Sequence, residues 1–172
     1  MREGILLPLG MTRSSFLEAD LDPDLRTTPH VGRREPEIGE VYPYHRAHAP
    51  SSTLHSNVEE MCTWIIASVN RGVLEPAADE SVGGARILAE ESYEQLWTPQ
   101  VEARPGRQFG LAWMLGDSPH GLWALHGGRD PGFRSHLSIF PDELSGLVIL
   151  SNYSETPIPP LRDALSKAIL GP

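Results

Sequence analysis

The sequence predicts an α/β fold in which an antiparallel sheet is flanked by helices. Between Leu122 and Asn152, three apolar runs rich in β-branched and aromatic residues are separated by GGRDPG and PDELSG, two clusters of turn-forming residues. This pattern is typical of a three-strand antiparallel meander. One segment before it and one after it place apolar residues at helical spacing, which indicates a helix on either side of the strands in the chain.

The first of these helices is predicted from Ser56 to Gly72. Ser56 and Glu59 match a capping box, in which the serine accepts from first-turn N–H groups and the glutamate returns the bond. Gly72 supplies a left-handed residue that ends the helix. The apolar residues between them are Val58, Met61, Cys62, Ile65 and Val69. A second, shorter helix is expected over 89–97.

The terminal helix begins at Pro159-Pro160 and ends before Gly171. We expect it to cover one face of the sheet. Its apolar face consists of Leu161, Ala164, Leu165, Ala168 and Ile169. Residues 109–115 are predicted to form one strand, and residues 116–121 a turn into the strand that starts at Leu122. Residues 12–50 contain five prolines and no sustained period, so we expect an irregular connection there, and residues 76–84 a loop.

Composition narrows the classes of function. The 172 residues, 40% of them hydrophobic, suffice for one core. A formal charge of -9 argues against nucleic acid and against anionic membrane surfaces as partners. No apolar run approaches the roughly 20 residues that span a bilayer. The single cysteine, Cys62, cannot form an internal disulfide, and no feature indicates a cellular location.

The motif His126-Gly127-Gly128 falls where the first strand of the meander is expected to end. Two glycines fill a core strand poorly, because they lack side chains to pack and cost backbone entropy. One interpretation is that another molecule approaches this backbone closely. The alternative is an ordinary strand end, with turn glycines and a histidine satisfied by a backbone carbonyl.

Together, His-Gly-Gly, Pro-Gly-Phe, Phe-Pro-Asp and the final Gly-Leu-Val-Ile-Leu-Ser-Asn resemble the third-motif region of the serine β-lactamase-like hydrolases. This family contains class C β-lactamases, D-alanyl-D-alanine carboxypeptidases, penicillin-binding proteins and related esterases, and many members carry His in place of the Lys of Lys-Thr-Gly. The likeness extends upstream, through Pro8-Leu9-Gly10-Met11-Thr12 with Phe16, residues 51–72 and Phe109-Gly110-Leu111-Ala112-Trp113.

The resemblance implies that residues 1–172 form a single incomplete domain, the C-terminal half of the β-lactamase/transpeptidase-like fold. Within it, residues 1–55 would be an irregular connecting region, 56–98 the helical part, and 109–172 the sheet and terminal helix. Strands from the other half would complete the sheet, so we expect an exposed strand edge and self-association through it.

Two of the family's motifs are missing from the sequence. Ser-x-x-Lys supplies the nucleophile and its base, but the only lysine, Lys167, has Ala164 three residues before it. Tyr-x-Asn supplies a second proton-transfer group, and none of the four tyrosines has Asn two residues later. The resemblance therefore implies the C-terminal portion of a serine hydrolase that is inactive alone. The alternative is a non-catalytic binding or interaction remnant of the family.

For the whole enzyme, the resemblance implies acyl transfer through a serine on a small-molecule or peptide ester, amide or β-lactam, with no cofactor and no metal. His126, Gly127 and Gly128 would line the pocket. The backbone N–H of Arg129 would donate to the developing oxyanion, an interaction worth about 3 kcal/mol.

Other candidate sites are weaker. Ser118 lies in a Gly-Asp-Ser-Pro-His-Gly segment, but a nucleophile elbow uses the N–H of the next residue and Pro119 has none, so we expect a hairpin turn. His45 and His48 lie between Pro43 and Pro50, which argues against a helix that would align them for a metal. The four tryptophans are expected in the core or in a cleft wall.

Overall fold

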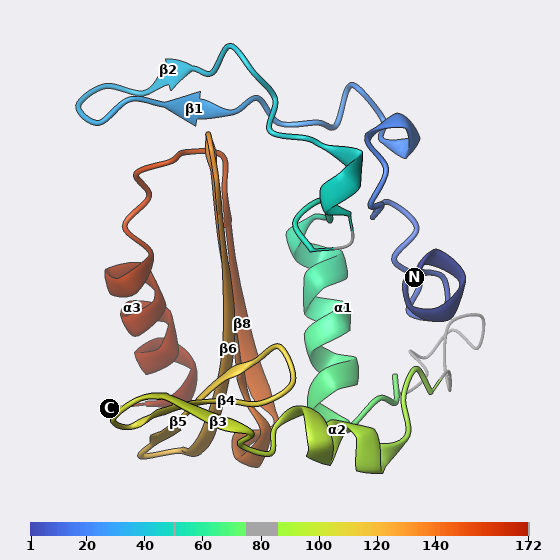
Figure 1. Cartoon of the computed structure of the whole chain (residues 1–172), viewed down its shortest axis with the longest axis vertical. Coiled ribbons are helices and arrows are strands. Elements are labelled where there is room, and N and C mark those ends of the chain that lie inside the picture. Colours follow the sequence, from blue (N-terminus) through green and yellow to red (C-terminus); the bar gives the residue numbers. More distant parts are fainter. Residues whose placement is uncertain (50, 75–85, 172) are drawn as a thin grey trace.

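A six-stranded antiparallel sheet forms the centre of the molecule, with strand order β3-β4-β5-β6-β7-β8. The computed structural model describes residues 1–49, 51–74 and 86–171. Figure 1 shows the sheet nearly edge-on between helices α1 and α3, which confirms the predicted fold class. The strands are β3 (Val101–Arg104), β4 (Arg107–Phe109), β5 (Met114–Ser118), β6 (Gly121–Asp130), β7 (Phe133–Phe140) and β8 (Ser145–Ser151). The loop predicted for residues 76–84 lies outside the described residues.

The predicted three-strand meander is confirmed as β6, β7 and β8, joined by a turn at Pro131-Gly132 and by the short 3-10 helix η4 (Pro141–Glu143). The expectation that β6 ends at His-Gly-Gly is wrong. The strand continues to Asp130, and Gly128 pairs with Ser135 of β7. Ladder hydrogen bonds use only the backbone, so the neighbouring strand holds the two glycines in line without side-chain packing.

The single strand predicted over 109–115 is also wrong. The chain bends between β4 and β5, where Ala112 has a φ of 64°. A Cβ on Gly110 would lie 2.2 Å from the carbonyl oxygen of Leu96, so the bend brings the chain against the end of α2. Strand β3 was not predicted from the sequence. The turn between β5 and β6 is confirmed but is only two residues long, because β5 extends to Ser118.

Helix α1 spans Val58–Val69 and its N-cap is Asn57, one residue after the predicted cap Ser56. The side chain of Asn57 accepts from the N–H of Glu60 at 3.0 Å. Ser56 instead has its hydroxyl 2.7 Å from that of Ser14, and Glu59 forms an ion pair with Arg13. The predicted capping box is therefore wrong, because both of its side chains contact the N-terminal segment. The left-handed residue that ends α1 is Arg71, with a φ of 51°, and Gly72 follows it with a φ of 91°. The predicted stop at Gly72 is therefore one residue too late. Helix α2 (Glu90–Leu96) matches the second predicted helix.

The main core lies between α1 and the sheet. The indole rings of Trp64 and Trp113 stack there at 5.8 Å, and Trp97 is buried, which agrees with the expectation for the tryptophans. The buried members are Ile65, Val69, Tyr93, Trp97, Trp113, Leu115, Ala124, Leu137 and Ile139. A second cluster packs the N-terminal turn against the other side of α1; it consists of Leu6, Leu9, Met11, Ala67 and Leu74.

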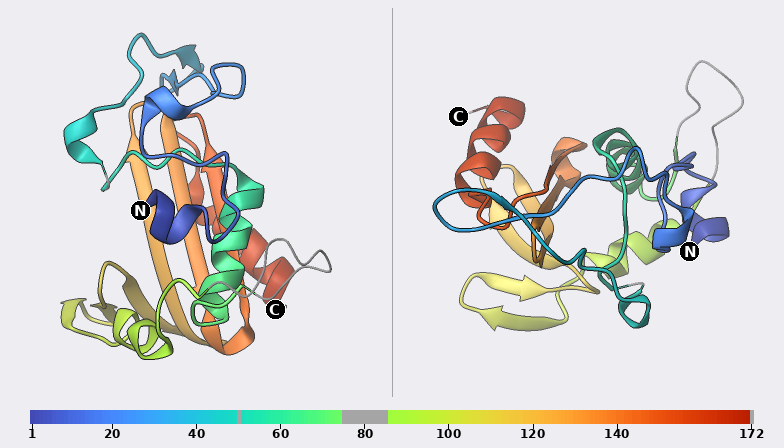
Figure 2. Two further views of the ribbon diagram at one scale, coloured as in Figure 1. Left: turned by 90° about the vertical axis from the view of Figure 1, so that its right-hand side faces the viewer. Right: turned by 90° about the horizontal axis from the view of Figure 1, so that it is seen from above.

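Helix α3 (Ile158–Leu170) covers the opposite face of the sheet, as predicted, and contacts β7 and β8 (Figures 1 and 2). Its predicted apolar face does not make this contact. Leu161, Leu165 and Ile169 are 41%, 41% and 48% exposed. The inner face carries Arg162, whose guanidinium lies 5.1 Å from the ring centroid of Trp123. The helix thus leaves an apolar stripe facing solvent. Among the described residues, no helix is long and apolar enough to cross a membrane.

The N-terminal 55 residues are mostly irregular. Their short elements are η1 (Arg2–Leu6), η2 (Glu18–Asp20), β1 (His30–Val31), β2 (Glu37–Ile38) and η3 (Arg46–His48). The β1–β2 hairpin lies across the end of the sheet where β6 turns into β7 (Figure 2). The N–H of His30 donates to the carbonyl of Asn152 at 2.9 Å, and a Cβ on Gly132 would lie 2.2 Å from Pro29. This close contact explains the glycine in the β6–β7 turn.

Candidate active site

One edge of β6 is open at the His-Gly-Gly motif. Strand β5 pairs with β6 only from Gly121 to Leu125. From His126 to Asp130, β6 keeps β7 on one side and has no strand on the other side among the residues that the structure describes. Residues 126–129 are exposed. An extended ligand could therefore approach this backbone from the side.

The register determines which backbone groups face the open edge. The carbonyl oxygen of Ser135 lies 3.5 Å from the Cβ position of Gly127, so this carbonyl points toward β6. Gly128 and Ser135 are thus a hydrogen-bonded pair. Such pairs alternate with non-hydrogen-bonded pairs along an antiparallel ladder. Gly127 and Arg129 consequently direct their N–H and C=O groups away from β7, toward the open edge.

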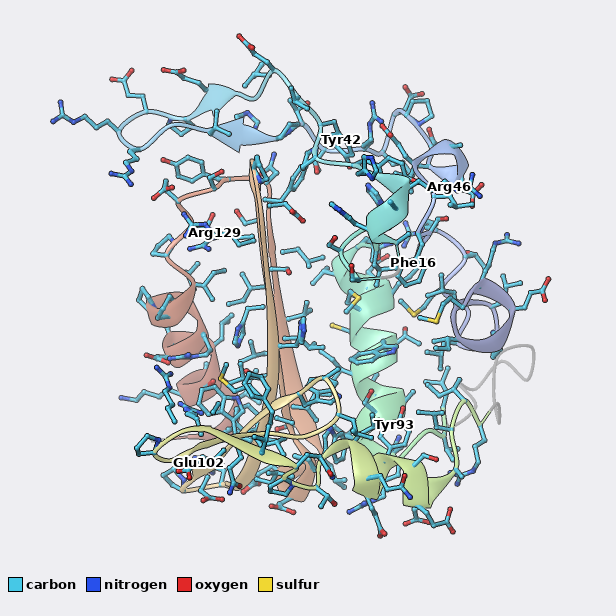
Figure 3. The ribbon with its side chains drawn as sticks, in the orientation of Figure 1. Phe16, Tyr42, Arg46, Tyr93, Glu102 and Arg129 are labelled. Atoms are coloured by element: carbon cyan, nitrogen blue, oxygen red, sulfur yellow. The ribbon has the colours of Figure 1, made fainter. Side chains whose placement is uncertain are left out.

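The side chains along this edge alternate between the two faces of the sheet. Ala124 belongs to the core beneath α1, so His126 and Asp130 lie on the α1 face. Arg129 lies on the α3 face, where its guanidinium is 3.7 Å from the carboxylate of Glu155; Figure 3 shows it on that side and Tyr42 on the other. The side chain of His126 makes no hydrogen bond within the described parts of the chain. The alternative of a histidine satisfied by a backbone carbonyl is therefore not observed.

A hollow of about 240 Å³ lies at the end of this edge. Asp130 forms one side of it. The aromatic rings of Tyr42 and Tyr44 form another side, and the remaining lining residues are Val41, Pro43, His45, His48, Ser52 and Thr53. His45 and His48 both line it, with ring centroids 5.1 Å apart. Within the described ranges, no group of three His, Cys, Asp or Glu could hold a metal ion.

Ser118 has no role at the open edge. Its hydroxyl donates to the carbonyl of Gly121 at 3.0 Å and accepts from the N–H of His120 at 3.1 Å. Both bonds close the β5–β6 hairpin, at the opposite end of β6 from the motif. The predicted hairpin turn is confirmed.

The structure contains a serine–histidine pair that was not predicted. The hydroxyl oxygen of Ser138 lies 2.7 Å from Nε2 of His136 and accepts from the indole N–H of Trp123 at 2.9 Å. Burial lowers the pKa of His136 to about 4, with a further contribution from Arg162. The ring is therefore neutral at pH 7 and Nε2 can accept the hydroxyl proton. Ser138 is 0% exposed and lies beneath α3, so it cannot reach a substrate.

The antiparallel sheet between helices matches about half of a β-lactamase fold. The model of the β-lactamase family matches residues 1–170. The chain belongs to this family. No curated protein sequence shows significant similarity to it.

Solved structures support the same fold. A β-lactamase/D-alanine carboxypeptidase from Pseudomonas syringae matches with a TM-score of 0.72 and 16% identity, over 99% of this chain and 51% of the other. A penicillin-binding protein from Bacillus halodurans matches with a TM-score of 0.69 and 15% identity, over 95% and 48%. A class C β-lactamase matches with a TM-score of 0.70 and 13% identity, over 98% and 49%. The chain thus spans about half the length of these structures.

Proposed function

We propose that this chain is the C-terminal portion of a serine hydrolase and supplies one wall of its active site. The whole enzyme transfers the acyl group of an ester, amide or β-lactam to a serine and then to water. The observation that carries the proposal is the open edge of β6, which directs the N–H of Arg129 toward the space beside His126 and Gly128.

This edge is suited to an electrostatic role. An N–H held by a strand is fixed in direction before the reaction, so it can stabilise a developing oxyanion without reorganisation. Gly127 and Gly128 leave the approach clear, because neither carries a side chain. His126 lies on the α1 face beside the same edge. Its position allows it to orient a substrate, while Arg129 provides the donor through its backbone.

The nucleophile and its proton carriers are expected from outside this chain, because the sequence contains neither Ser-x-x-Lys nor Tyr-x-Asn. Ser118 and Ser138 are both held in hydrogen bonds away from the edge. We therefore infer that the chain is inactive alone. A binding or interaction remnant remains the second candidate function, favoured by the same missing motifs.

Labelling with a fluorescent penicillin and a fluorophosphonate tests the proposal. The isolated chain should remain unlabelled, and a longer product of the same gene that includes an upstream Ser-x-x-Lys should be labelled at that serine. Labelling of this chain that one serine substitution abolishes would contradict the assignment of the nucleophile. A gene whose reading frame contains no upstream Ser-x-x-Lys would favour the binding remnant.

A further inference from the structure

The hollow at the end of β6 contains the carboxylate of Asp130, which has no partner among the residues that the structure describes. Asp130 is the first residue of the tight turn into β7, a position where aspartate commonly accepts from the N–H two residues ahead. Here that N–H, on Gly132, donates to the hydroxyl of Ser154 at 2.7 Å instead. Among the described residues, no hydrogen bond or ion pair reaches the carboxylate of Asp130.

Aromatic rings surround the same space. Tyr42 and Tyr44 both line the hollow, and both are partly buried. Two contacts hold the Tyr42 ring: it stacks on His55 at 5.7 Å and meets the edge of Phe133 at 5.7 Å. The guanidinium of Arg26 lies 4.6 Å from the same ring and is paired with Glu18. The Tyr42 ring is therefore held in place before any ligand binds.

This combination of groups matches the chemistry of an ammonium ion. A cation is attracted to the negative faces of aromatic rings and to an unpaired carboxylate, whereas an anion would be repelled by Asp130. Two nearby arginines are each paired with a carboxylate: Arg26, over the Tyr42 ring, with Glu18, and Arg129, on the other face of the sheet, with Glu155. The formal charge of -9 also favours the approach of a cation.

We propose that the hollow between Asp130, Tyr42 and Tyr44 binds a protonated amine. Because Asp130 is the last residue of the open β6 edge, a substrate lying along that edge would place its amine in the hollow and its carbonyl beside Arg129. The inference thus names the substrate class of the proposed enzyme, an amine-bearing carbonyl compound, and in that respect it depends on the proposed function. A volume of about 240 Å³ accommodates an ammonium group with a small hydrocarbon part.

Binding can be measured on the isolated chain, without catalysis. Saturation-transfer NMR at pH 8 with 2-phenylethylammonium should give a bound signal, while neutral 2-phenylethanol and anionic 3-phenylpropanoate should give little. Asp130→Asn should weaken ammonium binding up to about fivefold, the upper end of the range for a partly exposed ion pair. Tyr44→Leu should also weaken it, and Tyr44→Phe should retain it. Asp117→Asn is the matched control, because Asp117 is an exposed carboxylate on β5, in the hairpin at the other end of β6.

Equal binding of 2-phenylethanol and the ammonium ion would overturn the inference, as would an Asp130→Asn variant that is folded by circular dichroism and binds with unchanged affinity. Should Asp130→Asn fail to fold, the two Tyr44 variants provide the test. A folded Tyr44→Leu variant that binds the ammonium ion as well as Tyr44→Phe does would overturn the inference. The proposed function and the ammonium site can be disproved independently. If the longer protein forms an acyl-enzyme but the amine does not bind, only the ammonium site is wrong. If the amine binds but no acyl-enzyme forms, only the hydrolase assignment is wrong.

Discussion

The hydroxyl oxygen of Ser138 lies 2.7 Å from Nε2 of His136, beneath α3 and away from solvent. Trp123 donates to the same hydroxyl, and the ring of Trp123 stacks on Phe140 at 6.3 Å. The charged groups that face the histidine come from α3, namely Arg162 and Asp163. The pair thus lies within the sheet beneath α3, where burial favours the neutral imidazole.

This arrangement predicts a loss of stability in acid. The pKa of His136 is about 4 in the folded chain, below its ordinary value of 6.5, so the unfolded chain binds the proton more tightly. The corresponding stability is fully present above pH 6.5 and is lost as the pH falls toward 4. The difference between the two pKa values, 6.5 and about 4, limits this contribution to the free energy of unfolding to about 3 kcal/mol.

Urea unfolding of the wild type and of His136→Gln, each at pH 7.5 and pH 4.5, measures this effect. The wild type should lose more free energy of unfolding on acidification than the variant, by about 2 kcal/mol, because the variant has no ring to protonate at this site. Above pH 7 the two curves should run parallel. Identical acid dependence in both proteins would show that His136 is not a source of it.

The cap of α1 gives a second prediction. The side chain of Asn57 accepts from the N–H of Glu60, so Asn57→Ala should lower the free energy of unfolding by about 1 kcal/mol. Asn57→Asp is the matched control and should retain stability, because a carboxylate accepts the same bond and is favoured at a helix N-terminus. Thermal or urea unfolding measures the difference. An Asn57→Ala variant as stable as the wild type would mean that the N-terminus of α1 is capped by another residue.

The sequence identified features that depend on local patterns. Turn residues and the apolar runs between them predicted β6, β7 and β8, and Gly72 marked the end of α1 to within one residue, because Arg71 takes the left-handed position. The cap was misassigned because Ser56 and Asn57 are both good capping residues, and the choice depends on Ser14 and Arg13, which are more than 40 positions away. A local pattern contains no information about such contacts.

The face of α3 was misassigned for a related reason. Helical spacing correctly identified an apolar stripe through Leu161 and Leu165, but it cannot say which element the stripe packs against. The inner side instead uses the stem and guanidinium of Arg162 over Trp123, a contact that hydrophobic periodicity does not detect.

At the candidate active site, the sequence pattern identified His126-Gly127-Gly128. It did not indicate the unused carboxylate of Asp130, because that depends on the bond between Gly132 and Ser154.

The open edge of β8 predicts self-association of the isolated chain. Strand β8 is the last in the sheet, and Leu150 on it is 42% exposed. An exposed strand edge with apolar side chains offers unpaired N–H and C=O groups to another copy. Sedimentation velocity over a range of concentrations should detect association, and Leu150→Lys should reduce it. Leu25→Lys, at an exposed leucine outside the strands, is the matched control. A monomer at all concentrations would mean that the β8 edge is protected.

The open edge of β6 leads to a prediction about turnover, to be measured in the longer protein that contains the nucleophile. Gly128→Val would place a branched side chain on the α1 face beside the N–H of Arg129, where the substrate carbonyl has to approach. A Cβ at this position meets only the hydroxyl of Ser135, at 2.5 Å, and this hydroxyl can rotate away, so the fold should survive. Loss of one oxyanion donor lowers turnover about a hundredfold or more, and we expect a fall of that size.

Two comparisons separate this effect from damage to the fold. His126→Ala should lower turnover less than Gly128→Val, because the N–H of Arg129 stays in place. Gly4→Val adds the same side chain where a Cβ meets nothing within 4 Å, and it should leave turnover unchanged. Turnover and thermal unfolding are measured together for each variant. If Gly128→Val keeps near-normal turnover and a normal melt, the motif is an ordinary part of β6, and the oxyanion role assigned to Arg129 is wrong.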